Sequence, residues 1–280
     1  MAISNPVTGL SVKAETGQTS MDKGATVVRV TKRPFWLSSL KSLSKEIPLT
    51  IGYNQAFDSN WLIGVLRGHG DTPVVITITG HLASKSVSMP CLNFPGDLKN
   101  AYVRININSG VKIMGKGGSG GGDNYLYAPP NTKNNDRYDG QQGGPAIYNG
   151  IGARLQISNG GTIGGGGGGG GAIKSSSTNS SAVYQGGGGG YPMGDAGYCK
   201  IDGHSGYHSG KAGNMTVAGA GGQEGAWSAG SGGGLGGKGG NANNNTRGRD
   251  PGVGGAGGKA VYGSKPNWLA RGSVVGSSDF

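Results

Sequence analysis

The sequence predicts a mostly β-structured first region, followed by a glycine-rich region of packed polyglycine II helices with protruding loops. Glycine accounts for 63 of the 280 residues, and only 10 of these glycines precede residue 115. Short β-branched segments fill the first region, whereas the second region alternates glycine runs with polar inserts. This change in composition predicts two domains, residues 1–114 and 115–280, with a boundary near Met114.

The first region contains three segments with β-strand character. Residues 25–31, 73–82 and 101–107 are rich in β-branched residues, which largely alternate with polar ones, as in half-buried strands. Trp36 and Leu40 belong to a set of apolar residues at helical spacing, so a short amphipathic helix is expected there. A region of this length can bury a small hydrophobic core.

An internal repeat links the two regions. Residues 104–113 match residues 154–163 at an offset of 50 without a gap. Each copy alternates apolar and polar residues, turns at a Ser-Gly or Asn-Gly pair, and leads at once into glycine. We expect each copy to be a strand-turn unit that starts a glycine run in a packed layer.

The glycine runs are open to two interpretations, a flexible linker and a bundle of polyglycine II helices. Ordering eight residues costs on the order of 8–16 kcal/mol, whereas each hydrogen bond between runs contributes about 0.5–1.5 kcal/mol. A run must therefore be bonded on several sides, and a linker has no need of so many separate runs. The glycines expected to form this scaffold include Gly164, Gly168, Gly171, Gly186 and Gly190.

Five polar inserts separate the runs and are expected to form loops. They occupy residues 123–142, 172–185, 191–215, 223–229 and 241–251. Tyr, Trp and Arg dominate many binding surfaces, with Asn, Ser and Gly as adaptable neighbours. The candidate binding residues are Tyr125, Tyr127, Arg137, Tyr138, Tyr184, Tyr191, Met193, Tyr198, His204, Tyr207, His208, Trp227, Asn243, Arg247 and Arg249. Tyr148 and Tyr262, near strand-like stretches, are expected to cover the glycine bundle instead.

The sequence gives little support for catalysis, a cofactor or a metal site. Two matches to a phosphate-binding loop, at residues 110–117 and 232–239, lack the Ser or Thr that binds magnesium. Cys199, His204 and His208 have no second cysteine nearby, so a surface loop is the better interpretation than a zinc site. The scattered acidic residues form no catalytic pair along the sequence. We therefore expect a protein that is not an enzyme.

Several further motifs resemble those of a known family. They are residues 14–18 (AETGQ), 57–61 (FDSNW) and 76–82 (ITITGHL), together with the repeat and the alternation of glycine runs with five inserts. Over essentially its whole length the chain resembles the receptor-recognising adhesins at the tips of the long tail fibres of T-even-type bacteriophages.

The resemblance implies roles for both regions. The N-terminal domain would attach to the trimeric distal long-tail-fibre protein, and Trp36, Leu40 and Trp61 would contribute to that attachment. The C-terminal domain would be a sandwich of polyglycine II helices whose loops bind an outer-membrane protein of the host, such as a porin, sometimes with help from lipopolysaccharide. The adhesin would determine host range from the distal tip of the fibre in the virion. Because the N-terminus carries no apolar leader, assembly in the host cytoplasm is expected.

Two alternative functions remain open from the sequence, and a third lacks the features that it needs. A fibre-assembly chaperone that is not retained in the virion would share the same resemblance. A glycine-rich RNA-binding protein would account for the formal charge of +11 and for Arg247 and Arg249, although the arginine-glycine motif occurs once. A structural or ice-binding glycine-helix protein would need regular triplets and a flat face of repeated threonines, which this sequence lacks.

Overall fold

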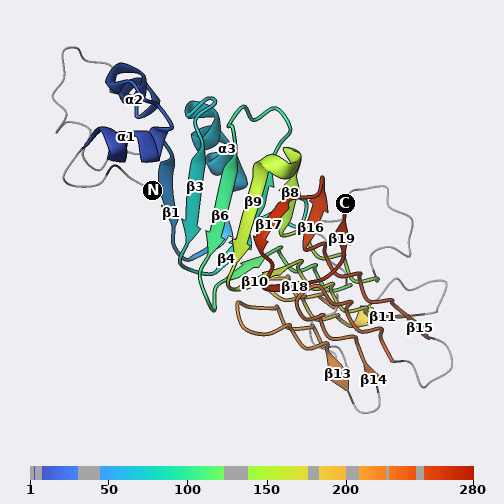
Figure 1. Ribbon diagram of the computed structural model, residues 1–280. Coiled ribbons are helices and arrows are strands. Elements are labelled where there is room, and N and C mark those ends of the chain that lie inside the picture. Colours follow the sequence, from blue (N-terminus) through green and yellow to red (C-terminus); the bar gives the residue numbers. More distant parts are fainter. Residues whose placement is uncertain are drawn as a thin grey trace.

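The computed structural model describes residue 3 and residues 8–30, 45–122, 138–175, 183–199, 208–224, 227–243 and 249–280. Three parallel sheets form its upper part, and a block of extended glycine segments lies below them (Figure 1). Within the described ranges, no helix is both long enough and apolar enough to cross a membrane.

The first sheet has five parallel strands. Val74 pairs with Val103, which in turn pairs with Leu155, and the register continues without a shift along these strands. Buried and half-buried residues alternate along β3, β6 and β9, as the sequence predicts for the segments at 73–82 and 101–107. In order across the sheet, the strands are β1 (Ile47–Ile51), β3 (Val74–Ile78), β6 (Val103–Ile107), β9 (Leu155–Asn159) and β17 (Asn267–Ala270).

Two further sheets are also parallel throughout. The second sheet contains β18 (Ser273–Val275), β10 (Thr162–Gly164), β7 (Lys112–Met114), β4 (Leu82–Ser84) and β2 (Asn54–Phe57). The third sheet contains β19 (Ser278–Asp279), β16 (Val261–Gly263), β8 (Ile147–Asn149) and β5 (Leu92–Phe94). The 3-10 helix η2 (Gly152–Arg154) connects β8 with β9.

The chain visits the three sheets in turn, so they form a three-sided parallel β-helix. Inward-facing aliphatic residues of all three sheets, such as Ile105, Ile113 and Ile147, belong to one buried core. The corner between β3 and β4 contains Gly80, where a Cβ would lie 2.3 Å from the backbone nitrogen of Tyr53. Glycine at this position lets two coils of the β-helix approach closely at the corner.

The N-terminal part contains two short helices rather than a strand. Helix α1 (Gly9–Thr16) begins with a capping box at Thr8, and α2 (Met21–Val27) follows it closely. The predicted strand at 25–31 is therefore wrong. Ala25 and Val28, three residues apart, instead bury one face of this segment against α1, so tertiary packing overrides the β-branched composition. The helix expected around Trp36 and Leu40 lies outside the described residues.

Helix α3 (Ser59–Gly68) follows β2 and packs against β5. The carboxylate of Asp58 accepts from the backbone N–H of Asn60 at 3.0 Å and so caps the helix. Leu62 and Leu66 face the core, whereas the side chain of Trp61 is 51% exposed. The Trp61 ring meets the ring of Phe57 edge-on, with 6.1 Å between their centroids.

The internal repeat folds as two strand-turn units, but its register differs from the alignment without a gap. In the second sheet Lys112 pairs with Thr162, at the predicted offset of 50. In the first sheet Ile105 pairs with Ile157, at an offset of 52, because the turn between the two strands is two residues shorter in the second copy than in the first. A shift of two residues keeps each side chain on its own face, so alternation alone does not reveal it.

The predicted boundary near Met114 does not separate the sheets. Strands β8, β9 and β10 follow this boundary, yet they pair with β5, β6 and β7, which precede it. Long excursions leave the β-helix after β7 and after β10, and they return at β8 and β16. The glycine-rich region is thus inserted into the coils of the β-helix.

Candidate functional site

The glycine segments form a block in which backbone bonds directly to backbone. Its central segment, residues 164–171, continues from β10. Every N–H from Gly165 to Gly171 donates to a carbonyl of another segment. Every carbonyl from Gly164 to Gly171 accepts from another segment, and the N···O distances of all these bonds are 2.6–3.2 Å. This satisfies the hydrogen bonding of a run that has no side chains to bury.

These hydrogen bonds have a period of three residues, so the central segment bonds to the same neighbouring segment at every third residue. The N–H groups of Gly166 and Gly169 donate to residues 140–144. The two residues that follow each of them donate to residues 186–191 and 237–240. Carbonyls of the central segment accept from residues 115–121, 230–236 and 252–258. Six segments therefore surround the central one.

The contacts leave no space for side chains between the segments. A Cβ at Gly168 would lie 1.9 Å from the carbonyl oxygen of Gly255, and a Cβ at Gly171 would lie 2.1 Å from that of Gly252. Similar backbone clashes, at 2.0 and 2.1 Å, would arise at Gly186 and Gly190, whereas a Cβ at Gly164 would lie 2.3 Å from the side chain of Leu235. The five glycines predicted to form the scaffold are all buried within the block.

The long connections between glycine segments emerge at one end of the block. The segment ends at residues 122, 138, 186, 230, 240 and 252 all lie near Gly171, which is the end remote from the β-helix. The turns at residues 191–194, 213–219 and 233–237 lie at the opposite end. We call the remote end the distal loop face. Its described parts are residues 173–175, 183–185, 198–199, 208–209, 223–224, 227–228, 243 and 249–251.

Short strand pairs connect the loops of this face. They form a three-stranded sheet of β12 (Val183–Gln185), β11 (Ile173–Ser175) and β15 (Arg249–Pro251), and a hairpin of β13 (Gln223–Glu224) and β14 (Trp227–Ser228). Single bridges add His208 to Gln185 and Asn243 to Ser228. Figure 1 shows β11, β13, β14 and β15 far from the first sheet. The loops are therefore joined into one surface.

Several predicted binding residues lie on the distal loop face. Tyr198 is 61% exposed, His208 and Asn243 are also exposed, and Trp227 is half-buried. The backbone of Tyr184 lies in β12 and that of Arg249 in β15. Sequence reasoning missed Gln223, Ser209 and Pro251, which are exposed on the same face. All three lie within the predicted inserts, and their residue types did not distinguish them from the other residues there. Tyr125, Tyr127, Arg137, His204, Tyr207 and Arg247 lie outside the described residues.

Tyr191 and Met193 do not belong to this face, so their assignment as loop contacts is corrected. Both lie in the turn at the β-helix end. Tyr191 is only 6% exposed and packs in a cluster with Met114, and the Nζ atom of Lys112 lies 5.6 Å from its ring centroid. The insert at 191–215 contains two further bonded segments, around Gly197 and Gly210, which carry the chain to the distal end and back.

The assignment of Tyr138 as a loop contact is also corrected. It is 5% exposed and packs against Ala172 and Cys199, and its carbonyl accepts from the N–H of Ala172 at 2.8 Å. It therefore supports the distal loop face from below. The described residues contain no cluster of three or more His, Cys, Asp or Glu side chains suited to a metal ion.

The family of the chain follows from comparison with known proteins. Residues 46–279 match the family model described as phage tail fibre adhesin Gp38, and residues 1–41 match the model of the Gp38 N-terminal domain. The chain belongs to the Gp38 phage tail fibre adhesins. This confirms the resemblance found in the sequence.

Two relatives of this Gp38-family adhesin cover its full length. The receptor-recognizing protein gp38 of Salmonella phage S16 is 41% identical over 278 residues, which are 99% of each chain. A chain in the crystal structure of the gp37-gp38 adhesin tip complex of the bacteriophage S16 long tail fiber is 39% identical and has a TM-score of 0.68. The match covers 99% of this chain and 99% of that one. The chain is therefore a phage tail fibre adhesin with a mostly β fold.

Proposed function

We propose that this adhesin ends a long tail fibre and binds an outer-membrane protein of the host through its distal loop face, thereby determining host range. One observation carries the proposal. All the long connections of the glycine block emerge together at the end remote from the β-helix, where short strand pairs join them. Such an arrangement presents several loops on one rigid support, as in other loop-based binding surfaces.

The support would be a sandwich of polyglycine II helices. The hydrogen bonds of the central segment recur every third residue, which is the period of this helix. Six neighbours bond to it, so the run is bonded on several sides, as the offset of its conformational entropy requires. Glycine fills these positions because any Cβ there would lie less than 2.5 Å from an atom of a neighbouring segment.

Attachment to the trimeric distal fibre protein would use the N-terminal part of the chain. The related crystal structure contains gp38 together with gp37, which makes a fibre protein the natural partner. Figure 1 shows α1 and α2 at the opposite end of the molecule from β13 and β14. Leu10 of α1 is 79% exposed and Trp61 of α3 is 51% exposed, so both offer apolar surface to a partner. The predicted contributions of Trp36 and Leu40 lie outside the described residues.

A porin-type barrel fits the distal loop face as a receptor. Such barrels present long extracellular loops and a polar lumen to the outside of the cell. The formal charge of +11 favours acidic receptor loops and also anionic lipopolysaccharide. In this proposal the adhesin is assembled in the host cytoplasm and remains in the virion at the distal tip of the fibre.

Phage adsorption tests the role of the distal loop face. Tyr198→Ala should reduce adsorption of the phage to its host, whereas Val217→Ala should leave it unchanged. Val217 is a matched control because it is 57% exposed, similar to Tyr198, but lies in a turn at the β-helix end. Equal adsorption by the wild type and a variant with several exchanged loops would overturn the assignment.

Two further measurements separate the receptor from the alternatives. Adsorption to a panel of host strains, each lacking one outer-membrane protein, should fail on a single strain. Protein analysis of purified virions should detect the chain, whereas a fibre-assembly chaperone would be absent from them.

A further inference from the structure

A second surface, far from the distal loops, lies on the outer face of the third sheet. Asn93, Tyr148, Tyr262 and Asp279 occupy matching register positions on β5, β8, β16 and β19. Their neighbours along β5 and β8 are buried, so the side chains of Asn93 and Tyr148 face outward. Tyr148 and Tyr262 therefore form part of a stripe across the sheet. The expectation that they cover the glycine bundle is wrong.

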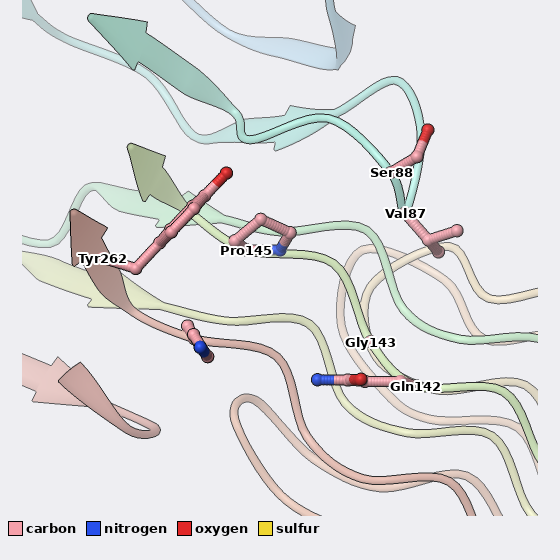
Figure 2. A pocket seen from close by; sticks show the side chains of 7 residues that line it. Val87, Ser88, Gln142, Gly143, Pro145 and Tyr262 are labelled. Atoms are coloured by element: carbon pink, nitrogen blue, oxygen red, sulfur yellow. The ribbon is translucent and has the colours of Figure 1, made fainter. Parts of the chain in front are cut away.

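The stripe borders a cavity of about 370 Å³ at the edge of the glycine block. Three chain segments line it where they enter the third sheet side by side. They contribute Val87 and Ser88 before β5, Gln142 and Pro145 before β8, and Lys259 and Tyr262 at the start of β16. Figure 2 shows the residues that line the cavity, with the Tyr262 ring beside Pro145. The size is that of a site for a small molecule.

The walls of the cavity combine aromatic surface with uncharged polar groups. Tyr262 supplies the aromatic wall. The ring of Tyr148 lies beside it, with 4.9 Å between the two centroids and a tilt of 44°. Gln142 and Ser88 are exposed, and the Gln142 amide can both donate and accept. The Ser88 hydroxyl shares a hydrogen bond of 2.9 Å with the Ser86 hydroxyl and keeps further capacity to accept.

The site carries little net charge. The Nζ atom of Lys259 lies 2.5 Å from a carboxylate oxygen of Asp279, so the two charges offset each other. The same Nζ atom lies 6.0 Å from the Tyr262 ring centroid. Burial raises the pKa of the Tyr262 phenol, and the neighbouring Tyr148 adds to this effect. The phenol therefore keeps its proton and can donate a hydrogen bond. A charged ligand would have to compete with the ion pair.

We propose that this surface is a binding site for a neutral saccharide unit. A pyranose ring has apolar C–H faces that stack on tyrosine rings, and hydroxyl groups at its edges that bond to amide, hydroxyl and carbonyl groups. Tyr262, with Tyr148 packed beside it, offers the ring face, and Gln142 and Ser88 offer the polar groups. Because the cavity lies at the base of the glycine block, a sugar could bind there while the distal loop face contacts a protein receptor.

Saturation-transfer NMR with a panel of neutral methyl hexosides tests the proposal. At least one hexoside should receive saturation from the wild-type protein at millimolar concentration. Tyr262→Ala should weaken its binding by about tenfold, corresponding to about 1.4 kcal/mol. Tyr262→Phe, which keeps the ring and loses only the hydroxyl group, should bind more tightly than Tyr262→Ala.

Matched variants keep the test decisive. Gln142→Ala changes an exposed side chain and should weaken binding even where Tyr262→Ala fails to fold. Tyr198→Ala, on the distal loop face, should leave hexoside binding unchanged and reduce adsorption to cells. The proposal is overturned if no hexoside binds, if Gln142→Ala binds like the wild type, or if a hexose phosphate binds more tightly than the neutral sugars.

Discussion

The substitution Gly169→Ala tests the glycine block most directly. A Cβ at this position would lie 1.9 Å from the carbonyl oxygen of Ser119, 2.4 Å from its carbon and 2.9 Å from the nitrogen of Gly120. All three atoms belong to backbone, so no flexible side chain can move aside. The added methyl group must push the central segment away from residues 115–121.

The expected loss of stability has two parts. Overpacking of an interior costs about 1–3 kcal/mol. Separation from that segment also weakens the bonds that the N–H groups of Gly118 and Gly121 donate to the carbonyls of Gly167 and Gly170, at about 1 kcal/mol each. The free energy of unfolding should fall by roughly 3–5 kcal/mol, and the melting temperature by on the order of 10 °C.

Thermal and urea unfolding followed by circular dichroism measure this loss. Gly234→Ala is the matched control, because a Cβ at that exposed turn glycine meets nothing within 4 Å and its φ is not positive. The control should unfold within about 0.5 kcal/mol of the wild type. If Gly169→Ala proves as stable as Gly234→Ala, the packing of backbone against backbone does not exist in solution.

Three other predictions concern the β-helix. Arg154→Ala should lower the free energy of unfolding by about 2–3 kcal/mol, because its Nη1 atom donates to the carbonyls of Leu98 and Asn100 at 2.8 Å each; unchanged urea unfolding would contradict this. Burial raises the pKa of the Cys91 thiol from 9.0 to about 12. The unfolded chain therefore loses this proton first, and stability should fall between about pH 9 and 12, less so in Cys91→Ala. Gly64→Ala in α3 should stabilise the protein by about 0.5–1 kcal/mol, since a Cβ there meets nothing within 4 Å; calorimetry would detect the rise in melting temperature.

Much of the fold was predictable where local pattern and packing agree. The alternation in 101–107 predicts β6, and the repeat predicts the two strand-turn units that lead into glycine. The β-branched segment at 25–31 misled the prediction because Ala25 and Val28 pack against α1. The three-sided path of the strands was not predictable, since alternation shows which face is buried but not which strand lies next to it.

The candidate site was predictable in its residue types but only partly in its geometry. Tyr198 and His208 lie on the distal loop face, whereas Tyr191 lies near the β-helix within the same predicted insert. The segments around Gly197 and Gly210 contain too few glycines to stand out as runs, although each bonds to neighbours on both sides. The composition of this insert therefore gives no sign that the chain reverses its direction there.

The sequence by itself determined that long stretches of this protein must pack without side chains, because uninterrupted glycine permits backbone contacts that any Cβ would block. It also determined the family, through motifs spread along the whole chain. Only the tertiary structure decided which ends of the glycine segments meet, and hence which loops share a face. That arrangement depends on the parallel pairing of β7 with β10 and of β8 with β16, which aligns the segments that leave and enter the β-helix. Contacts between residues so distant in sequence leave no local signal, because each glycine run fits any of its possible neighbours equally well.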